Sequence, residues 1–124
     1  MAENKVTKTE MKALPYIIAV DFDGTLVEDK FPHIGEKRET VWNKMRQARK
    51  SGAKIILWTS RDHENLEQAV LFCREQGWEF DSINENLKEV RELFNNDTRK
   101  VFADEYWDDK SIGQFCNNIF TRGE

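Results

Sequence analysis

Residues 16–25 read YIIAVDFDGT, an apolar run that leads into two aspartates separated by one residue. The run predicts a buried strand, in which alternate residues share a face, so we expect Asp21 and Asp23 to lie close together. Gly24 allows a sharp turn after them. Neighbouring carboxylates repel, so the pair needs a bound cation or a shared proton, and a Mg²⁺ site is the simplest arrangement. The alternative is a strand ending in an ordinary polar turn.

Length and composition narrow the function classes. The chain has 124 residues and a net charge of −4, with 39% hydrophobic and 34% charged residues. The length predicts a single domain, at residues 14–124, and the polar, Lys- and Glu-rich residues 1–13 predict a flexible arm. The negative charge argues against stable nucleic-acid binding. The sequence has neither a membrane-spanning run nor a signal-peptide core, so we expect a cytoplasmic protein with no membrane partner, whose Cys73 and Cys116 are reduced.

Strand and helix patterns alternate along the chain. Apolar segments predict strands at residues 15–21, 54–59, 80–83 and 100–107. Apolar residues at helical spacing predict helices at residues 36–51, 62–76, 87–94 and 111–120, and a loop is expected at 24–35. This order predicts an α/β fold, a parallel sheet of about four to five strands with helices on both faces. Ligands of such sheets bind beyond the carboxyl ends of the strands.

Four short motifs resemble those of the haloacid dehalogenase (HAD) superfamily of phosphohydrolases, which use an aspartate nucleophile. Residues 21–25, DFDGT, resemble the first motif, and Thr59 after an apolar strand resembles the second. Lys100 is the best match to the third motif, and Asp108 with Asp109 matches the fourth. The resemblance covers residues 17–109. It implies a three-layer, Rossmann-like, HAD-type catalytic domain.

The resemblance implies roles for the acidic residues. Asp21 is expected to attack phosphorus and form an aspartyl-phosphate, and Asp23 to act first as general acid and then as general base. Mg²⁺ is expected to bind Asp21, the backbone carbonyl of Asp23, and Asp108. Asp109 is then a further ligand, or it orients the site through water.

Other residues are candidates for substrate contacts. By resemblance, the Thr59 hydroxyl, a backbone amide near Ser60 and the Lys100 ammonium hold the phosphoryl oxygens. Thr59 can also be a plain strand-end hydroxyl, and Ser60 a helix cap. Arg61, at the mouth of the expected site, either touches substrate or is a solvated arginine. His33 lies where related enzymes carry a flap, and is either a substrate contact or an ordinary loop residue.

Two of these assignments have competitors. Asp104 lies four residues before Asp108, which matches an Asp-x-x-x-Asp variant of the fourth motif and makes it an alternative metal ligand. By strand rise it lies roughly 13 Å deeper, so it would reach the same ion only if the strand ended early. Arg99 and Lys88 compete with Lys100 as the phosphate-binding cation.

The spacing of the motifs leaves no room for the cap domain that many related enzymes carry. An open site suits large phosphorylated substrates, or a second subunit supplies the lid in a homodimer. The predicted function is therefore Mg²⁺-dependent hydrolysis of phosphomonoesters, on a small molecule or on an exposed phosphate of a macromolecule. Nucleotide and sugar phosphates are the classes to consider. Residues 103–109 are somewhat similar to a segment of the small deoxyribonucleotidases. This likeness, over one segment, does not identify the substrate.

Three other functions compete with a phosphatase. A receiver-type signalling domain has similar length and an acid pair. It also needs a phosphorylated aspartate at the end of the third strand, and the sequence has no aspartate in that place, near Ile83 and Asn84. A catalytically idle binding protein on the HAD fold is disfavoured by the presence of both Asp21 and Asp23. A phosphomutase would normally need a cap to retain its intermediate.

Overall fold

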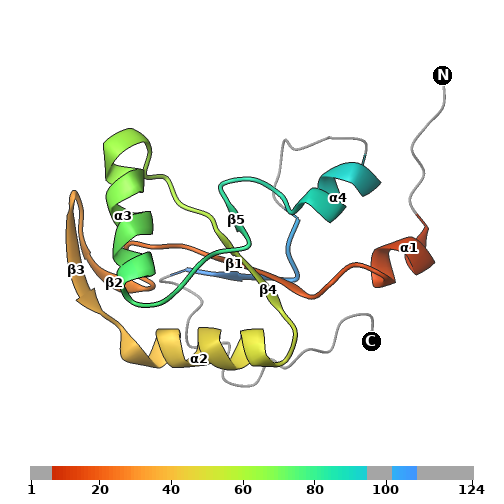
Figure 1. Cartoon of the computed structure of the whole chain (residues 1–124), viewed down its shortest axis with the longest axis horizontal. Coiled ribbons are helices and arrows are strands. Elements are labelled where there is room, and N and C mark those ends of the chain that lie inside the picture. The colour runs from red at the N-terminus through yellow and green to blue at the C-terminus, as the bar shows by residue number, and fades with distance from the viewer. Residues whose placement is uncertain (1–6, 95–101, 109–124) are drawn as a thin grey trace.

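A computed structural model describes residues 7–94 and 102–108 of the chain. Their helices and strands are, in chain order, α1 (Lys8–Lys12), β1 (Ile17–Val20), β2 (Val27–Lys30), β3 (His33–Lys37), α2 (Glu39–Lys50), β4 (Lys54–Leu57), α3 (His63–Glu75), β5 (Ser82–Ile83), α4 (Lys88–Leu93) and β6 (Glu105–Trp107) (Figure 1).

A parallel sheet of four strands forms the centre, in the order β5-β4-β1-β6. Ile18 pairs with Ile55 on one side and with Glu105 on the other, so β1 is an inner strand. In chain order the strands run 3-2-1-4, which is the Rossmann-like order, whereas receiver-type sheets place the third strand beside the first. The topology therefore argues against the receiver alternative. The order reverses between β1 and β6, and ligands of such sheets bind at this switch point.

Two apolar clusters cover the two faces of the sheet. Ile18 and Val20 belong to a large cluster with α2 and α3, which supply Trp42, Met45, Ala69 and Cys73 among others. Ile17 packs on the opposite face in a smaller cluster with Leu14, Ile56, Leu87 and Val90, the last of these from α4. The alternation of strand side chains thus buries both faces. The expected α/β fold, with a parallel sheet and helices, is confirmed at this level.

The loop predicted at residues 24–35 is instead largely an antiparallel hairpin, formed by β2 and β3. Only Val27 of β2 is buried, so the segment lacks the apolar alternation from which a strand is recognised. Gly35 makes the pairing possible, because a Cβ at this position would collide with the carbonyl oxygen of Glu28. The hairpin lies beside α3 (Figure 1).

The arm predicted at residues 1–13 contains the short helix α1. Thr7 and Glu10 start it as a capping box: the Glu10 N–H donates to Thr7 Oγ1 (3.0 Å), and the Thr7 N–H donates to Glu10 Oε1 (2.9 Å). The strands and the remaining described helices are shorter than predicted by one to five residues at an end. The helix predicted at 111–120 lies outside the described residues. Within the described part of the chain, no helix is long and apolar enough to cross a membrane.

Candidate active site

A cavity of about 450 Å³ lies at the carboxyl edge of the sheet. It includes the switch point between β1 and β6. The residues around it are Ala19, Asp21, Trp58, Thr59, Ser60, Asn84, Tyr106, Trp107 and Asp108. Its volume falls within the roughly 300–1,000 Å³ that is usual for small-molecule sites.

Asp21 and Asp108 reach this cavity from neighbouring strands. The Asp21 N–H donates to the carbonyl of Trp107 (2.9 Å), which extends the pairing of β1 and β6 by one residue. The Phe22 N–H donates to Asp21 Oδ1 (2.7 Å) and so orients the carboxylate. Both aspartates line the cavity. The structure therefore brings the predicted nucleophile and the predicted metal ligand of the fourth motif together.

The chain turns sharply after Asp21. The Phe22 carbonyl accepts the N–H groups of Thr25 (3.1 Å) and Leu26 (2.9 Å), and the Gly24 N–H donates to the Val27 carbonyl (2.8 Å). Gly24 has a φ of +83°, a conformation that suits glycine. Asp23 is bracketed by these bonds, none of which uses its own carbonyl oxygen. That oxygen is therefore a candidate metal ligand.

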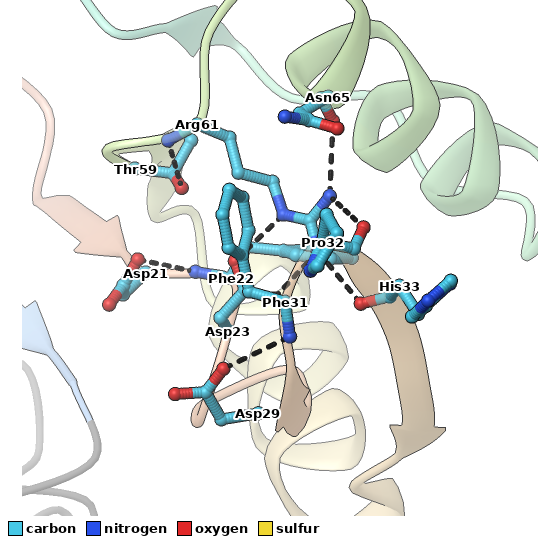
Figure 2. A network of polar contacts seen from close by, with 10 residues as sticks. All are labelled: Asp21, Phe22, Asp23, Asp29, Phe31, Pro32, His33, Thr59, Arg61 and Asn65. Atoms are coloured by element: carbon cyan, nitrogen blue, oxygen red, sulfur yellow. Dashed lines mark hydrogen bonds and ion pairs between the residues drawn. The ribbon is translucent and has the colours of Figure 1, made fainter.

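The carboxylate of Asp23 is bound by Arg61 (Figure 2). Arg61 Nε donates to Oδ2 (2.7 Å) and Nη2 donates to Oδ1 (2.8 Å), a bidentate ion pair. The Arg61 side chain is fully buried and that of Asp23 is 16% exposed. Strand alternation ends at Val20, the last residue of β1, and Asp23 does not line the cavity. The sequence did not predict that Arg61 would bind the Asp23 carboxylate instead of leaving it to line the cavity with Asp21.

Arg61 also ties three segments together. Its guanidinium donates to the carbonyls of Pro32 (3.3 Å), His33 (3.0 Å) and Asn65 (3.3 Å). It lies over the rings of Phe22 and Phe31, at 5.1 and 5.0 Å from their centroids, a cation–π arrangement. The residue joins the first-motif loop, the hairpin and the start of α3 (Figure 2).

This geometry corrects two expectations about substrate contacts. Arg61 is 2% exposed and does not stand at the mouth of the cavity. His33 contributes its backbone carbonyl to Arg61, while the residue is exposed and does not line the cavity. The reason is that Arg61 finds a carboxylate partner inside the fold, and buried guanidinium groups need such partners.

Thr59 and Ser60 line the cavity as predicted from their place after β4. The Thr59 hydroxyl oxygen accepts the Arg61 N–H (3.2 Å), so its own hydrogen remains available for donation. The Thr59 N–H donates to Asn84 Oδ1 (2.8 Å). The Asn84 N–H in turn donates to the Leu57 carbonyl (2.8 Å).

Asn84 is a cavity residue that the sequence analysis missed. Its φ is +54°, in the left-handed region that Asn tolerates better than most residues. Because its Oδ1 faces Thr59, its amide NH₂ group is the remaining polar end of the side chain. The signal in the sequence was an asparagine directly after a short strand.

The structure removes Asp104 from the metal site. Asp104 Oδ2 accepts the N–H of Ile17 (2.8 Å), and its own N–H donates to the Ile17 carbonyl (2.7 Å). Ile17 begins β1, whereas Asp21 follows its end, so Asp104 lies at the opposite edge of the sheet. The prediction that it is an alternative ligand is wrong, because β6 continues to Trp107 instead of ending early.

Of the three cations considered as phosphate ligands, only Lys88 belongs to the described residues. Lys100 and its competitor Arg99 lie outside the described residues, as does Asp109. Lys88 is exposed on α4, pairs with Glu92 at 3.9 Å and does not line the cavity. Lys88 is therefore not a phosphate ligand of this cavity.

The donors at the cavity and next to it fit a magnesium ion. The carboxylates of Asp21 and Asp108 line the cavity, and the carbonyl of Asp23 belongs to the turn that follows Asp21; all three are hard oxygen ligands. Among residues 7–94 and 102–108, no group of three or more His, Cys, Asp or Glu side chains is placed to hold a metal. A set of two carboxylates and one carbonyl is compatible with that finding, since Mg²⁺ usually keeps several waters and takes few protein carboxylates.

Comparison with known proteins gives one informative match. A solved structure of a conserved protein from Bacteroides thetaiotaomicron is 36% identical to the chain, with a TM-score of 0.66. The match covers 78% of this chain and 78% of that one. No protein-family model matches the sequence, and no curated protein matches it at a significant level.

Proposed function

We propose that this chain, which belongs to the same family as the conserved Bacteroides thetaiotaomicron protein, is a Mg²⁺-dependent phosphomonoester hydrolase of the HAD type. One observation carries the proposal. Asp21, Thr59 and Asp108, each from a different motif, line one cavity at the ends of three neighbouring parallel strands. A nucleophile, a hydroxyl donor and a second carboxylate are the groups that phosphoryl transfer through an aspartate requires.

Asp21 is the proposed nucleophile. Its carboxylate oxygen forms a bond to phosphorus, and the bond from phosphorus to the ester oxygen breaks. The leaving oxygen takes a proton from a general acid, for which Asp23 is our candidate. Water then attacks the phosphorus of the aspartyl-phosphate and gives a proton back to that group. This second step releases inorganic phosphate and restores the Asp21 carboxylate.

Polar groups around Asp21 suit the phosphoryl oxygens. The Thr59 hydroxyl can donate one hydrogen bond, because its oxygen already accepts the Arg61 N–H. Ser60 and the amide of Asn84 line the same cavity. Lys100 and Asp109 remain predicted contributors from residues outside the described part.

The proposed metal ligands are the Asp21 and Asp108 carboxylates and the Asp23 carbonyl. Bound Mg²⁺ would neutralise charge on the phosphoryl group. The backbone turn through Phe22 and Gly24 fixes the position of Asp23 relative to Asp21. Asp23 can thus contribute a carbonyl while its carboxylate is engaged elsewhere.

The ion pair with Arg61 has to break before Asp23 can act as the general acid. The Asp23 carboxylate accepts a hydrogen bond on each oxygen, and it does not line the cavity. To protonate the leaving group it has to separate from Arg61 and turn towards Asp21. This pair favours a second candidate function, a phosphate-binding protein that does not turn over.

The proposed fold is three-layered, Rossmann-like and without a cap. Between Thr25 and Thr59 the structure holds a hairpin, α2 and β4, and between Thr59 and Phe94 it holds α3, β5 and α4. Neither stretch contains a further domain. Such a site suits exposed phosphates, or a second copy of the chain completes it.

Hydrolysis of p-nitrophenyl phosphate tests the proposal. We expect turnover by the wild type with Mg²⁺, and loss of turnover with EDTA or with Asp21→Asn. Asp104→Asn is a matched control, because it also removes an acidic side chain of the sheet but lies at the other edge. If the Asp21→Asn variant were as active as the wild type, Asp21 would not be the nucleophile. Phosphate binding without any turnover would favour the binding protein.

A further inference from the structure

We propose that Trp58 and Tyr106 form a slot that binds an aromatic ring carried by the leaving group of the substrate. The inference rests on the proposed function and names the substrate class. The substrate would be a phosphomonoester whose leaving group carries a flat aromatic ring close to the phosphate. A nucleobase and a phenol share this chemistry.

The sheet register places both rings on one face. Ala19 pairs with Ile56 on β4 and with Tyr106 on β6. Trp58 comes two residues after Ile56, and its N–H donates to the Val20 carbonyl (2.9 Å), which extends the pairing with β1 to this residue. Its side chain therefore belongs to the same face of the sheet as those of Ala19 and Tyr106. Asp21, two residues after Ala19, follows the end of β1.

Ala19 lies on the strand between those that lead to the two aromatic residues, directly beside Tyr106. Trp58 is two residues further along than Ile56, the partner of Ala19, so the backbones of Trp58 and Tyr106 are about 10 Å apart across β1 and about 7 Å apart along it. The methyl group of Ala19 is the smallest side chain that could occupy the floor between them, apart from the hydrogen of glycine. All three residues line the cavity together with Asp21.

Both rings are partly exposed to solvent. Trp58 is 39% exposed and Tyr106 is 43% exposed, whereas Trp42, Trp78 and Trp107 are buried. The other exposed large hydrophobic residues of the described part stand apart from the cavity: Phe31 packs on Arg61, and Leu71 belongs to α3. Exposed aromatic side chains that line a cavity are characteristic of ring-binding sites.

The polar and apolar parts of the cavity are contiguous. Asp21, Thr59 and Asn84 supply its polar side, and Trp58, Ala19 and Tyr106 its apolar side. A ligand that satisfies both has a charged phosphate next to a flat apolar ring. A volume of about 450 Å³ accommodates a molecule of that size.

Equilibrium binding tests the slot without any requirement for turnover. The titrations use O-phosphotyrosine, adenosine 5′-monophosphate and, as the ligand without a ring, O-phosphoserine, each with EDTA present. Stacking on an aromatic side chain changes affinity by roughly tenfold or more. We expect at least one ring-bearing ligand to bind the wild type about tenfold more tightly than phosphoserine. Preference for phosphotyrosine would identify a phenol, and preference for the nucleotide a nucleobase.

Substitutions assign the preference to the slot. We expect Trp58→Ala to remove it while leaving phosphoserine binding unchanged, and Trp58→Phe, which retains a ring, to keep most of it. Leu71→Ala is the matched control, since Leu71 is 55% exposed and does not line the cavity. Equal binding of all three ligands, no binding of either ring-bearing ligand, or a preference that survives in Trp58→Ala would overturn the proposal.

The same titrations separate this inference from the proposed function. A preference that depends on Trp58, found in a protein that hydrolyses nothing, supports the slot and rejects the phosphatase. Mg²⁺-dependent hydrolysis with no such preference supports the phosphatase and rejects the slot.

Discussion

Arg61 holds both carboxylate oxygens of Asp23, at 2.7 and 2.8 Å, in the interior of the protein. The arginine side chain is fully buried, and it joins the first-motif loop to the hairpin and to α3. One ion pair thus fixes the loop that carries the proposed nucleophile. It also holds the proposed general acid away from the cavity.

Loss of this ion pair should destabilise the fold. We predict that Arg61→Ala lowers the free energy of unfolding by about 3–5 kcal/mol, because the Asp23 carboxylate would be left largely buried without its partner. Urea denaturation measures the change. The matched control is Arg74→Ala, whose partner Glu79 and own side chain are 71% and 54% exposed. The control should change stability by less than about 1 kcal/mol. Similar losses in the two variants would contradict a stabilising role for the buried pair.

The role of Asp23 in proton transfer can be tested with two substrates whose leaving groups differ in their need for a proton. We predict that Asp23→Asn slows hydrolysis of an alkyl phosphate by about 10²–10⁴-fold, because an alkoxide needs a proton as it leaves. Hydrolysis of p-nitrophenyl phosphate should suffer much less, since nitrophenolate leaves without one. The measurement is kcat on both substrates. Equal losses on the two would assign Asp23 a positioning role only, through Arg61 and the backbone.

Asp108 and Asp104 should behave in opposite ways. Asp108 lines the cavity, so we predict that Asp108→Asn raises the Mg²⁺ concentration needed for half-maximal activity by at least tenfold. Asp104 accepts the N–H of fully buried Ile17. Asp104→Ala should therefore cost about 1–3 kcal/mol of stability without changing the metal requirement. A higher Mg²⁺ requirement in Asp104→Ala, with an unchanged requirement in Asp108→Asn, would indicate that Asp104 is the metal ligand.

Much of the fold was predictable because its strands are buried on both faces. Residues 17–20 and 55–57 are continuous apolar runs of the kind found in parallel sheets, and the helix patterns follow them. The hairpin was missed because it is mostly exposed and is held by backbone pairing, which leaves no apolar alternation. The sequence contains the capping box of α1, Thr7 and Glu10, but the surrounding segment is polar and has no apolar pattern that would predict a helix.

The candidate site was predictable where residues follow a strand within one or two positions. Asp21, Thr59 and Asp108 each come at a strand end, and parallel strand ends meet at one edge. The ion pair of Arg61 with Asp23 could not be predicted from the sequence, because it joins residues 38 positions apart in the chain. Asp104 was misread because spacing alone does not tell where β6 ends.

Cys73 gives the stability a dependence on alkaline pH. Burial raises the pKa of its thiol from 9.0 to about 12. In the unfolded chain the thiol ionises first, so this contribution is complete below about pH 9 and is lost as the pH rises towards 12. We predict that the free energy of unfolding falls by about 1.4 kcal/mol per pH unit more steeply in the wild type than in Cys73→Ala above pH 9. Parallel pH profiles for the two proteins would contradict the assignment.

The most direct test of the account is the location of the phosphoryl group during turnover. The wild type is mixed with p-nitrophenyl phosphate and Mg²⁺, quenched in acid and reduced with borohydride, which converts an aspartyl-phosphate to homoserine. Mass spectrometry of the peptide that contains residues 16–25 then locates the change. We predict homoserine at position 21 and unchanged aspartate at position 23. Turnover that leaves Asp21 unmodified, or a phosphoryl group on another residue, would contradict it.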